Sequence, residues 1–129
     1  MERKVTVRRI TGKQLIGTAR HHTVVTDRTP EEQGTDIGCT SGELLLLAIG
    51  SCSMGGMRRY FEERGEACER LSADVFFEAQ QSGRDRIVIS VHVDPACTEL
   101  DEKALTAAAT GGGVVSRLKL GSDVHVRIS

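Results

Sequence analysis

The sequence predicts an α+β domain, in which helices and strands occupy separate stretches of the chain. Two helical segments, one of them strongly apolar, are separated by a hairpin signal, and alternating strand patterns precede and follow them. The expected order is βββ-α-ββ-α-β, and strands segregated from two apolar helices suggest an antiparallel sheet wrapped around them. The chain has 129 residues, which is enough for one such domain over 1–129 and too few for two.

Composition narrows the classes of function. With 17 basic and 18 acidic residues the net charge is -1, so we expect no nucleic-acid partner and no attraction to an anionic membrane. An aromatic content of 3% also argues against stacking platforms for single-stranded nucleic acid. The N-terminus lacks the apolar stretch of a signal peptide, and the four cysteines form no Cys-x-x-Cys pair. We therefore expect a cytoplasmic protein with reduced thiols.

Three strands are expected before the first helix. Residues 4–10 alternate between apolar and polar side chains, and a turn at Gly12 follows them. Residues 14–17 and 18–27 then suggest two further strands or one long bent strand. Turn formers and charges in 27–38 predict a loop that leads to the helix.

The first helix is expected over 41–64. Thr40 and Glu43 have the spacing of a capping box, in which each side chain accepts from the backbone N–H of the other residue. Residues 44–49 are apolar on every side, so we expect this part of the helix to be enclosed by protein. Gly65 predicts a left-handed C-terminal cap.

The second half of the chain repeats the alternation of strand and helix. Residues 71–80 and 86–93 flank a turn-rich segment and predict a hairpin. A second helix is expected over 98–118, although Gly111–Gly113 either breaks it or permits close packing. A final strand is expected over 123–128, with its alternating apolar side chains directed inward.

Cys52 is the candidate nucleophile. The residues around it are small, from Gly50 to Gly56, so another backbone or a ligand can approach the sulfur. A buried cysteine commonly acts only as a small hydrophobic residue, and from the residues alone both interpretations remain open. The four histidines predict no metal site, since His21 and His22 would point to opposite faces of a strand.

The segment from Glu43 to Cys52, Glu-Leu-Leu-Leu-Leu-Ala-Ile-Gly-Ser-Cys, resembles the cysteine helix of the OsmC/Ohr family (osmotically inducible protein C and organic hydroperoxide resistance proteins). The strand that ends in Asp27 and the order of elements from residue 20 to 129 resemble that family as well. The resemblance implies an OsmC-like intertwined homodimer that reduces organic hydroperoxides with a pair of cysteines. No cofactor is implied. The implied partners are a second copy of the chain, a small organic hydroperoxide and a thiol reductant.

The resemblance also assigns roles to residues. Cys52 matches the peroxidatic cysteine of the family, whose thiolate attacks the peroxide and becomes a sulfenic acid. The family uses an arginine from its N-terminal half to activate this thiol, and Arg20 and Arg28 are the candidates here. Glu43 matches the glutamate of the family motif, with capping as its first role and orientation of the arginine as a second.

One departure from the family concerns the resolving cysteine. That residue stands in a phrase like Cys-Pro-Val-Ser, whereas this chain has Gly113-Val114-Val115-Ser116. Cys39 would lie ~18–20 Å from Cys52 along a helix, too far for a disulfide within one chain. Cys68 and Cys97 are expected in loops, with incidental roles. The sequence thus predicts a one-cysteine peroxidase that uses an external thiol, or alternatively a non-catalytic protein that binds a small hydrophobic or sulfur-containing ligand.

Overall fold

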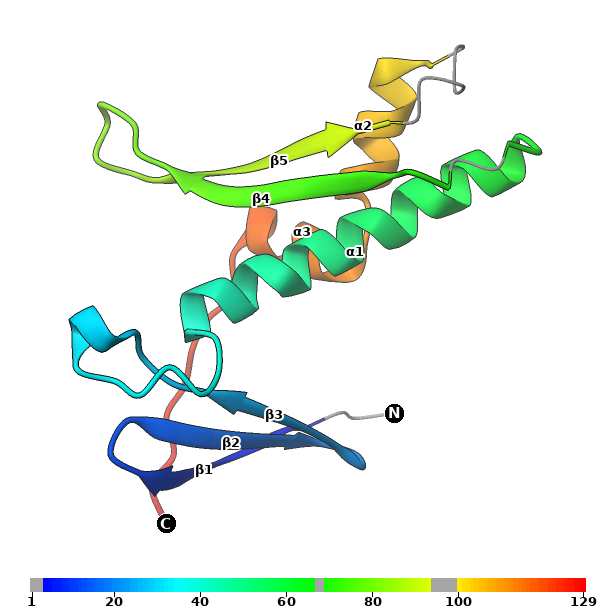
Figure 1. The fold of residues 1–129 in the computed structure, drawn as a ribbon. Helices are drawn as coiled ribbons and strands as arrows, with labels where there is room; N and C mark the ends of the chain where they lie inside the picture. Colours follow the sequence, from blue (N-terminus) through cyan, green and yellow to red (C-terminus); the bar gives the residue numbers. More distant parts are fainter. Residues whose placement is uncertain (1–3, 67–68, 94–99) are drawn as a thin grey trace. The chain divides into compact units, whose positions relative to one another are not determined.

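The computed structural model describes residues 4–66, 69–93 and 100–129. Contacts within the chain divide it into two compact units, Met1–Leu45 and Leu46–Ser129, and each unit is described by itself. The prediction of a single domain over 1–129 stays a prediction. Both units fit the predicted α+β class, because antiparallel strands and helices follow one another along the chain (Figure 1).

The first unit contains a three-stranded antiparallel sheet in the order β1-β2-β3. Its strands are β1 (Thr6–Thr11), β2 (Gln14–Ala19) and β3 (His22–Thr26), so residues 14–27 form two strands and not one bent strand. Gly12 has a φ of +54° in the first turn, and Arg20 has a φ of +57° in the second. A short 3-10 helix, η1 (Pro30–Glu32), interrupts the loop that follows the sheet.

Asp27 organises that loop from the end of β3. Its carboxylate is buried and accepts hydrogen bonds from the Thr35 hydroxyl at 2.5 Å and from the backbone N–H groups of Arg28 and Ile37 at 2.7 and 3.2 Å. The bond from the Thr35 side chain is the main cause that lowers the pKa of Asp27 below its ordinary value. A single carboxylate therefore fixes the path of about ten residues of irregular backbone.

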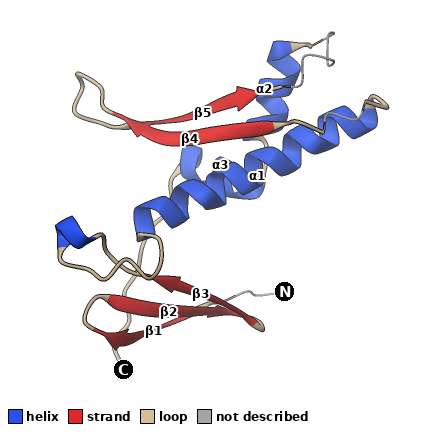
Figure 2. Cartoon of the chain, in the orientation of Figure 1, coloured by secondary structure: helices blue, strands red, loops and turns tan. Residues whose placement is uncertain are grey.

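Helix α1 (Ser41–Glu63) begins in the first unit and continues through the second. The second unit adds a hairpin of β4 (Ser72–Glu78) and β5 (Arg86–His92), followed by α2 (Glu102–Thr110) and α3 (Gly113–Leu120), as Figure 2 shows. The predicted cap at Gly65 is confirmed: its φ is +66°, and the N–H of Glu66 donates to the carbonyl of Phe61 at 2.9 Å.

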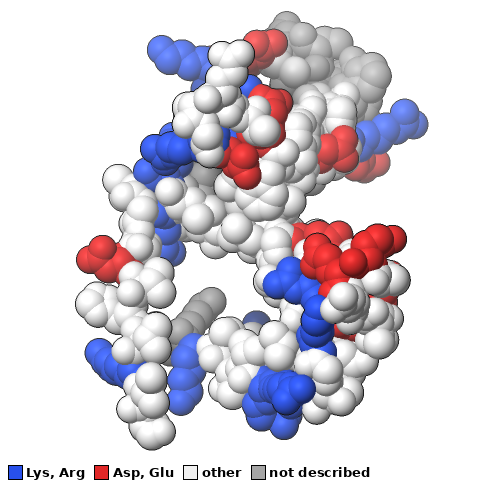
Figure 3. All heavy atoms as spheres, turned by 90° about the vertical axis from the view of Figure 1, so that its left-hand side faces the viewer, with Lys and Arg blue, Asp and Glu red and all other residues white. Residues whose placement is uncertain are grey.

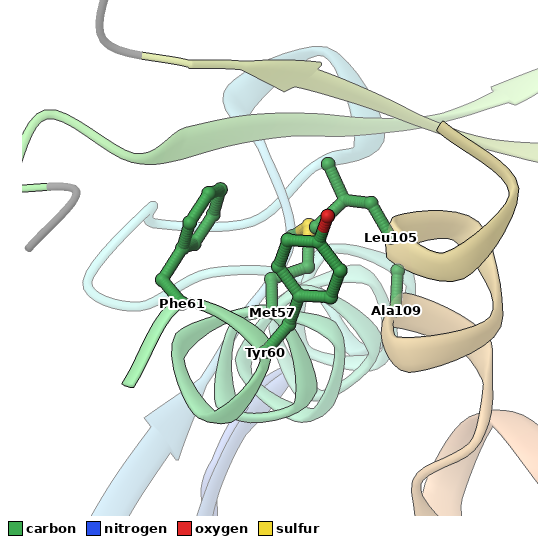
Figure 4. Close-up of a cluster of buried hydrophobic side chains, with 5 residues drawn as sticks. All are labelled: Met57, Tyr60, Phe61, Leu105 and Ala109. Carbon is green, nitrogen blue, oxygen red and sulfur yellow. The ribbon is translucent and has the colours of Figure 1, made fainter. Parts of the chain in front are cut away.

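The core of the second unit lies between α1 and α2. In Figure 4, Met57 and Tyr60 of α1 face Leu105 and Ala109 of α2. Phe61 completes the cluster and meets the Tyr60 ring edge to face, with ring centroids 5.0 Å apart. This cluster fixes how α2 crosses α1, and so it also fixes what lies beside Cys52, about one and a half to two and a half turns earlier in α1.

The single chain leaves two segments uncovered that were expected to be buried. Leu45 and Leu47 are 38% and 62% exposed and burial begins only at Ile49, so enclosure of residues 44–49 by a second copy of the chain stays a prediction. The predicted final strand is also missing: within the described part of the chain, residues 121–129 form no strand, and Val124 and Ile128 are about nine-tenths exposed. A strand needs a neighbour to satisfy its backbone, and among the described residues none pairs with this segment.

The second helix is likewise not continuous. It divides into α2 and α3 at Gly111 and Gly112, and residues 98 and 99 of its expected start lie outside the described residues. Asp101 caps α2 by accepting from the Ala104 N–H at 3.1 Å. The glycines therefore do break the helix, and they also permit close packing, as the surroundings of Cys52 show.

Candidate active site around Cys52

Cys52 lies one turn before a close contact between α1 and α2. Gly56 packs against the backbone carbonyl of Ala108, and a Cβ at position 56 would overlap that oxygen. Ser53 is fully buried, and its hydroxyl donates to the Ala109 carbonyl at 2.6 Å. This carbonyl belongs to the last turn of α2, where carbonyls have no partner within the helix. The small residues around Cys52 thus bring a second helix end next to the thiol.

The break between α2 and α3 places Gly112 directly against the sulfur. A Cβ at position 112 would overlap the Sγ of Cys52 and would lie 4.0 Å from its Cβ. Gly112 is also the N-cap of α3, with no side-chain hydrogen bond to the first turn of that helix. Backbone N–H groups of a first helical turn favour negative charge in their vicinity. The site therefore combines a thiol with a helix N-terminus that no side chain caps.

A groove of about 630 Å³ opens over the thiol. Its lining comes from one face of α1, from α2 and from the glycine break: Ser51, Cys52, Gly55, Gly56, Arg59, Tyr60, Glu63, Arg64, Ala104, Ala107, Ala108, Gly111, Gly112 and Gly113. A neighbouring hollow of about 680 Å³ is larger, but none of its described lining residues is a cysteine. The chemistry of Cys52 therefore points to the smaller groove.

Two arginines of this groove were not anticipated from the sequence. Arg59 stands two helical turns after Cys52 on the same face of α1, a relation that the seven-residue spacing could have shown. Arg64 is held by Tyr60: its guanidinium carbon lies 3.7 Å from the ring centroid, and its Nη1 donates to the Tyr60 carbonyl at 3.2 Å. The groove thus has a thiol at one end and cationic groups at the other.

Glu43 forms the predicted capping box. Its Oε1 accepts from the Thr40 N–H at 2.9 Å, and the Thr40 hydroxyl accepts from the Glu43 N–H at 3.2 Å. The bond from the Thr40 backbone is the main cause that lowers the pKa of Glu43 below its ordinary value. The capping role is therefore confirmed, whereas a role in orienting an arginine stays a prediction.

Arg20 and Arg28 both belong to the first unit. Arg20 occupies the exposed turn between β2 and β3. Arg28 pairs with Glu32 at 3.3 Å, and both side chains are about half exposed, so the pair contributes little to stability. Cys52 belongs to the second unit, and activation of its thiol by either arginine stays a prediction.

The cysteines within the described residues are both free thiols. Cys39 and Cys52 are each half-buried, and the carbonyl of Cys39 accepts from the Asp27 N–H at 3.1 Å. Cys68 and Cys97, expected in loops, lie outside the described residues. The position matched to the resolving cysteine, Gly113, is the first residue of α3, and a Cβ there would have no atom of Cys52 within 4 Å.

The described residues form neither a metal-binding cluster nor a membrane-spanning helix. Across residues 4–66, 69–93 and 100–129, no group of three or more His, Cys, Asp or Glu side chains could hold a metal ion. Over the same ranges, no helix combines the length and the apolar composition that crossing a bilayer requires.

The chain is similar to known proteins in both sequence and fold. The chain matches the family described as OsmC-like protein over residues 32–127. Its fold is similar to that of the OsmC like protein from Mycoplasma pneumoniae (TM-score 0.70, 11% identity, 92% of this chain and 88% of that one). It is also similar to the organic hydroperoxide resistance protein OsmC from Legionella pneumophila (TM-score 0.58, 14% identity, 92% and 90%). A third similar fold is that of the organic hydroperoxide resistance protein OhrB of Bacillus subtilis (TM-score 0.52, 18% identity, 84% of this chain and 83% of that one). A comparison with curated proteins found no match.

Proposed function

The chain belongs to the OsmC-like protein family, and on this premise we propose that it reduces organic hydroperoxides with Cys52 and an external thiol. The observation that carries the proposal is the free Cys52 thiol, which lies in an open groove against the uncapped N-terminus of α3. Two proteins of similar fold are organic hydroperoxide resistance proteins, which agrees with this chemistry.

The reaction begins with the Cys52 thiolate. Its sulfur attacks the terminal oxygen of the hydroperoxide, the O–O bond breaks, and the alkoxide takes a proton and leaves as the alcohol. The sulfur, oxidised by two electrons, carries a hydroxyl as a sulfenic acid. A first external thiol displaces this hydroxyl as water and forms a mixed disulfide, and a second thiol releases Cys52 and a small disulfide.

The glycines of the site suit these reaction steps. Gly112 leaves the sulfur approachable, because any side chain at that position would occupy the space above Sγ. Arg20 or Arg28 from the N-terminal half, together with Glu43, remains our proposal for activation of the thiol. An arginine keeps its charge at all relevant pH values and can hold both sulfur and peroxide.

Stopped-flow oxidation by an alkyl hydroperoxide tests the proposal. Wild-type protein should show a fast phase that saturates at one equivalent of peroxide, and Cys52→Ser should not. Cys39→Ser is the matched control, since Cys39 is a second half-buried free thiol. A fast phase that survives in Cys52→Ser but disappears in Cys39→Ser would place the reactive sulfur elsewhere.

We also propose that the chain acts as a homodimer. Several large apolar side chains remain exposed in the single chain, among them Leu47, Leu120, Val124, Val126 and Ile128, and a second copy would cover such groups. Sedimentation at micromolar concentration should give twice the mass of the chain. A folded monomer under these conditions would contradict the proposal.

The alternative is a binding protein without turnover. It is favoured by the glycine at position 113, which leaves oxidised Cys52 without a partner on α3. In that case the groove would hold a small hydrophobic or sulfur-containing ligand. A Cys52 thiol that is inert to alkyl hydroperoxide, in a protein that retains such a ligand through purification, would support this alternative.

A further inference from the structure

We propose that the groove over Cys52 selects thiols that carry carboxylate groups, with Arg59 as the residue that determines this specificity. The inference rests on the proposed function, because it names the chemical class of the external thiol that reacts at the same sulfur.

Arg59 lies on the same face of α1 as Cys52. Seven residues at 1.5 Å per residue place its Cα about 10 Å along α1 from Cys52, on the same face after two turns. Helical side chains lean toward the N-terminus, and Cys52 lies on that side of Arg59 in α1. Both residues line the same groove. A small thiol with a carboxylate several bonds from its sulfur spans the remaining distance.

The guanidinium of Arg59 has no ion-pair partner among the described residues. Its neighbour Arg58 pairs with Glu62 at 2.9 Å and lines a different hollow. Among the residues that the structure describes, no carboxylate lies within ion-pair distance of Arg59. Arg59 therefore offers a free guanidinium, which binds a carboxylate through two parallel hydrogen bonds.

The groove carries more basic than acidic side chains. Arg64 adds a second guanidinium, fixed in place by the Tyr60 ring, and Glu63 adds one carboxylate. The net charge of the groove is thus positive, although that of the chain is -1. Figure 3 shows basic and acidic side chains interspersed over the face that it draws. Attraction of an anionic thiol would therefore come from the groove itself and not from the field of the whole molecule.

In the reaction, the carboxylate-bearing thiol supplies both electrons. One molecule attacks the sulfenic sulfur of Cys52, the S–O bond breaks, and water leaves as a mixed disulfide forms. A second molecule attacks this disulfide, and the Cys52 thiol and a symmetrical disulfide are released. Arg59 holds the carboxylate of the thiol that stands in the mixed disulfide.

Thiol–disulfide exchange tests the preference without any peroxide. In a variant in which Cys39, Cys68 and Cys97 are serine, Cys52 is mixed with oxidised glutathione, bis(2-hydroxyethyl) disulfide or cystamine, which are anionic, neutral and cationic. Intact mass follows formation of the mixed disulfide, and each rate is divided by the rate for the same protein unfolded in urea. The normalised rates should fall in the order anionic, neutral, cationic, and the preference should weaken in 0.5 M salt.

Arg59→Gln is the decisive variant, with Arg58→Gln as its matched control one position away. Arg59→Gln should lower the ratio of the anionic to the neutral rate about threefold to fivefold, as expected for an exposed ion pair, and Arg58→Gln should leave it unchanged. An unchanged ratio in Arg59→Gln, an equal change in Arg58→Gln, or no reaction of folded protein with any disulfide would overturn the inference. If the preference holds but alkyl hydroperoxide does not oxidise Cys52, only the proposed function fails.

Discussion

Replacing Gly112 with cysteine should place a resolving partner directly beside Cys52. A Cβ at position 112 lies 4.0 Å from the Cβ of Cys52, within the range of about 3.5–4.5 Å found in disulfides. By contrast, a Cβ at Gly113 has Arg117 Nη1 as its nearest neighbour, at 3.0 Å, and no atom of Cys52 within 4 Å. The geometry therefore favours position 112, one residue before the position that the family resemblance indicates.

The expected effect on stability follows from loop closure. A disulfide between positions 52 and 112 closes a loop of about 60 residues, which corresponds to ~4 kcal/mol in the chain-entropy model. The new Cβ also overlaps Sγ, and such overpacking typically costs about 1–3 kcal/mol. The oxidised variant should thus be more stable than the protein with Gly112 by about 1–3 kcal/mol.

The assay uses a background in which Cys39, Cys68 and Cys97 are serine. Mild oxidation should remove two hydrogens from Gly112→Cys, as measured by intact mass, and urea unfolding should give the difference in stability. Gly113→Cys is the matched control and should remain a dithiol under the same conditions. A disulfide that forms in Gly113→Cys and not in Gly112→Cys would refute the placement of the glycine break against the sulfur.

Three further predictions concern the elements that position the site. Thr40→Ala should lower the free energy of unfolding by ~1 kcal/mol in urea titrations, whereas Glu43→Gln should keep most of the stability, since glutamine also serves in a capping box. Ser53→Ala should cost about 1–2 kcal/mol in the same assay, because the Ala109 carbonyl loses its buried donor. The pKa of Asp27 is lowered on folding, so the stability that it contributes is present above its ordinary pKa of 3.8 and lost as pH falls through the folded value. Asp27→Asn should therefore flatten the dependence of the unfolding midpoint on pH below about 4, and an unchanged acid profile would contradict this role.

Local signals in the sequence predicted the parts of the fold that local physics determines. The capping box at Thr40, the glycine cap at residue 65 and the β4–β5 hairpin each depend on residues close together in the chain, and each is present. The final strand was predicted wrongly, because alternation shows which face of a segment is apolar but not whether a neighbouring strand exists. The apolar neighbours of Leu47 in the sequence likewise predicted its burial, yet a single chain leaves Leu47 exposed.

The site, too, was predicted only where it depends on residues close together in the chain. Small residues around Cys52 indicated a close approach, but the sequence could not show that Gly112 is the approaching backbone, since that contact depends on how α2 crosses α1. Arg59 was not predicted, because the family resemblance indicated only arginines of the N-terminal half. Its place in the groove follows from helical periodicity and could have been found by counting two turns from Cys52.

The proposed reaction requires that hydroperoxide oxidises Cys52 and that no cysteine of the same chain resolves the sulfenic acid. Intact-mass measurement after one equivalent of an alkyl hydroperoxide, without added thiol, tests it most directly. The protein should gain one oxygen on Cys52, and excess peroxide should carry this sulfur to the sulfinic and sulfonic acids. No change in mass would contradict the peroxidase chemistry. A loss of two hydrogens, with Cys52 joined to Cys39, Cys68 or Cys97, would contradict the absence of a partner.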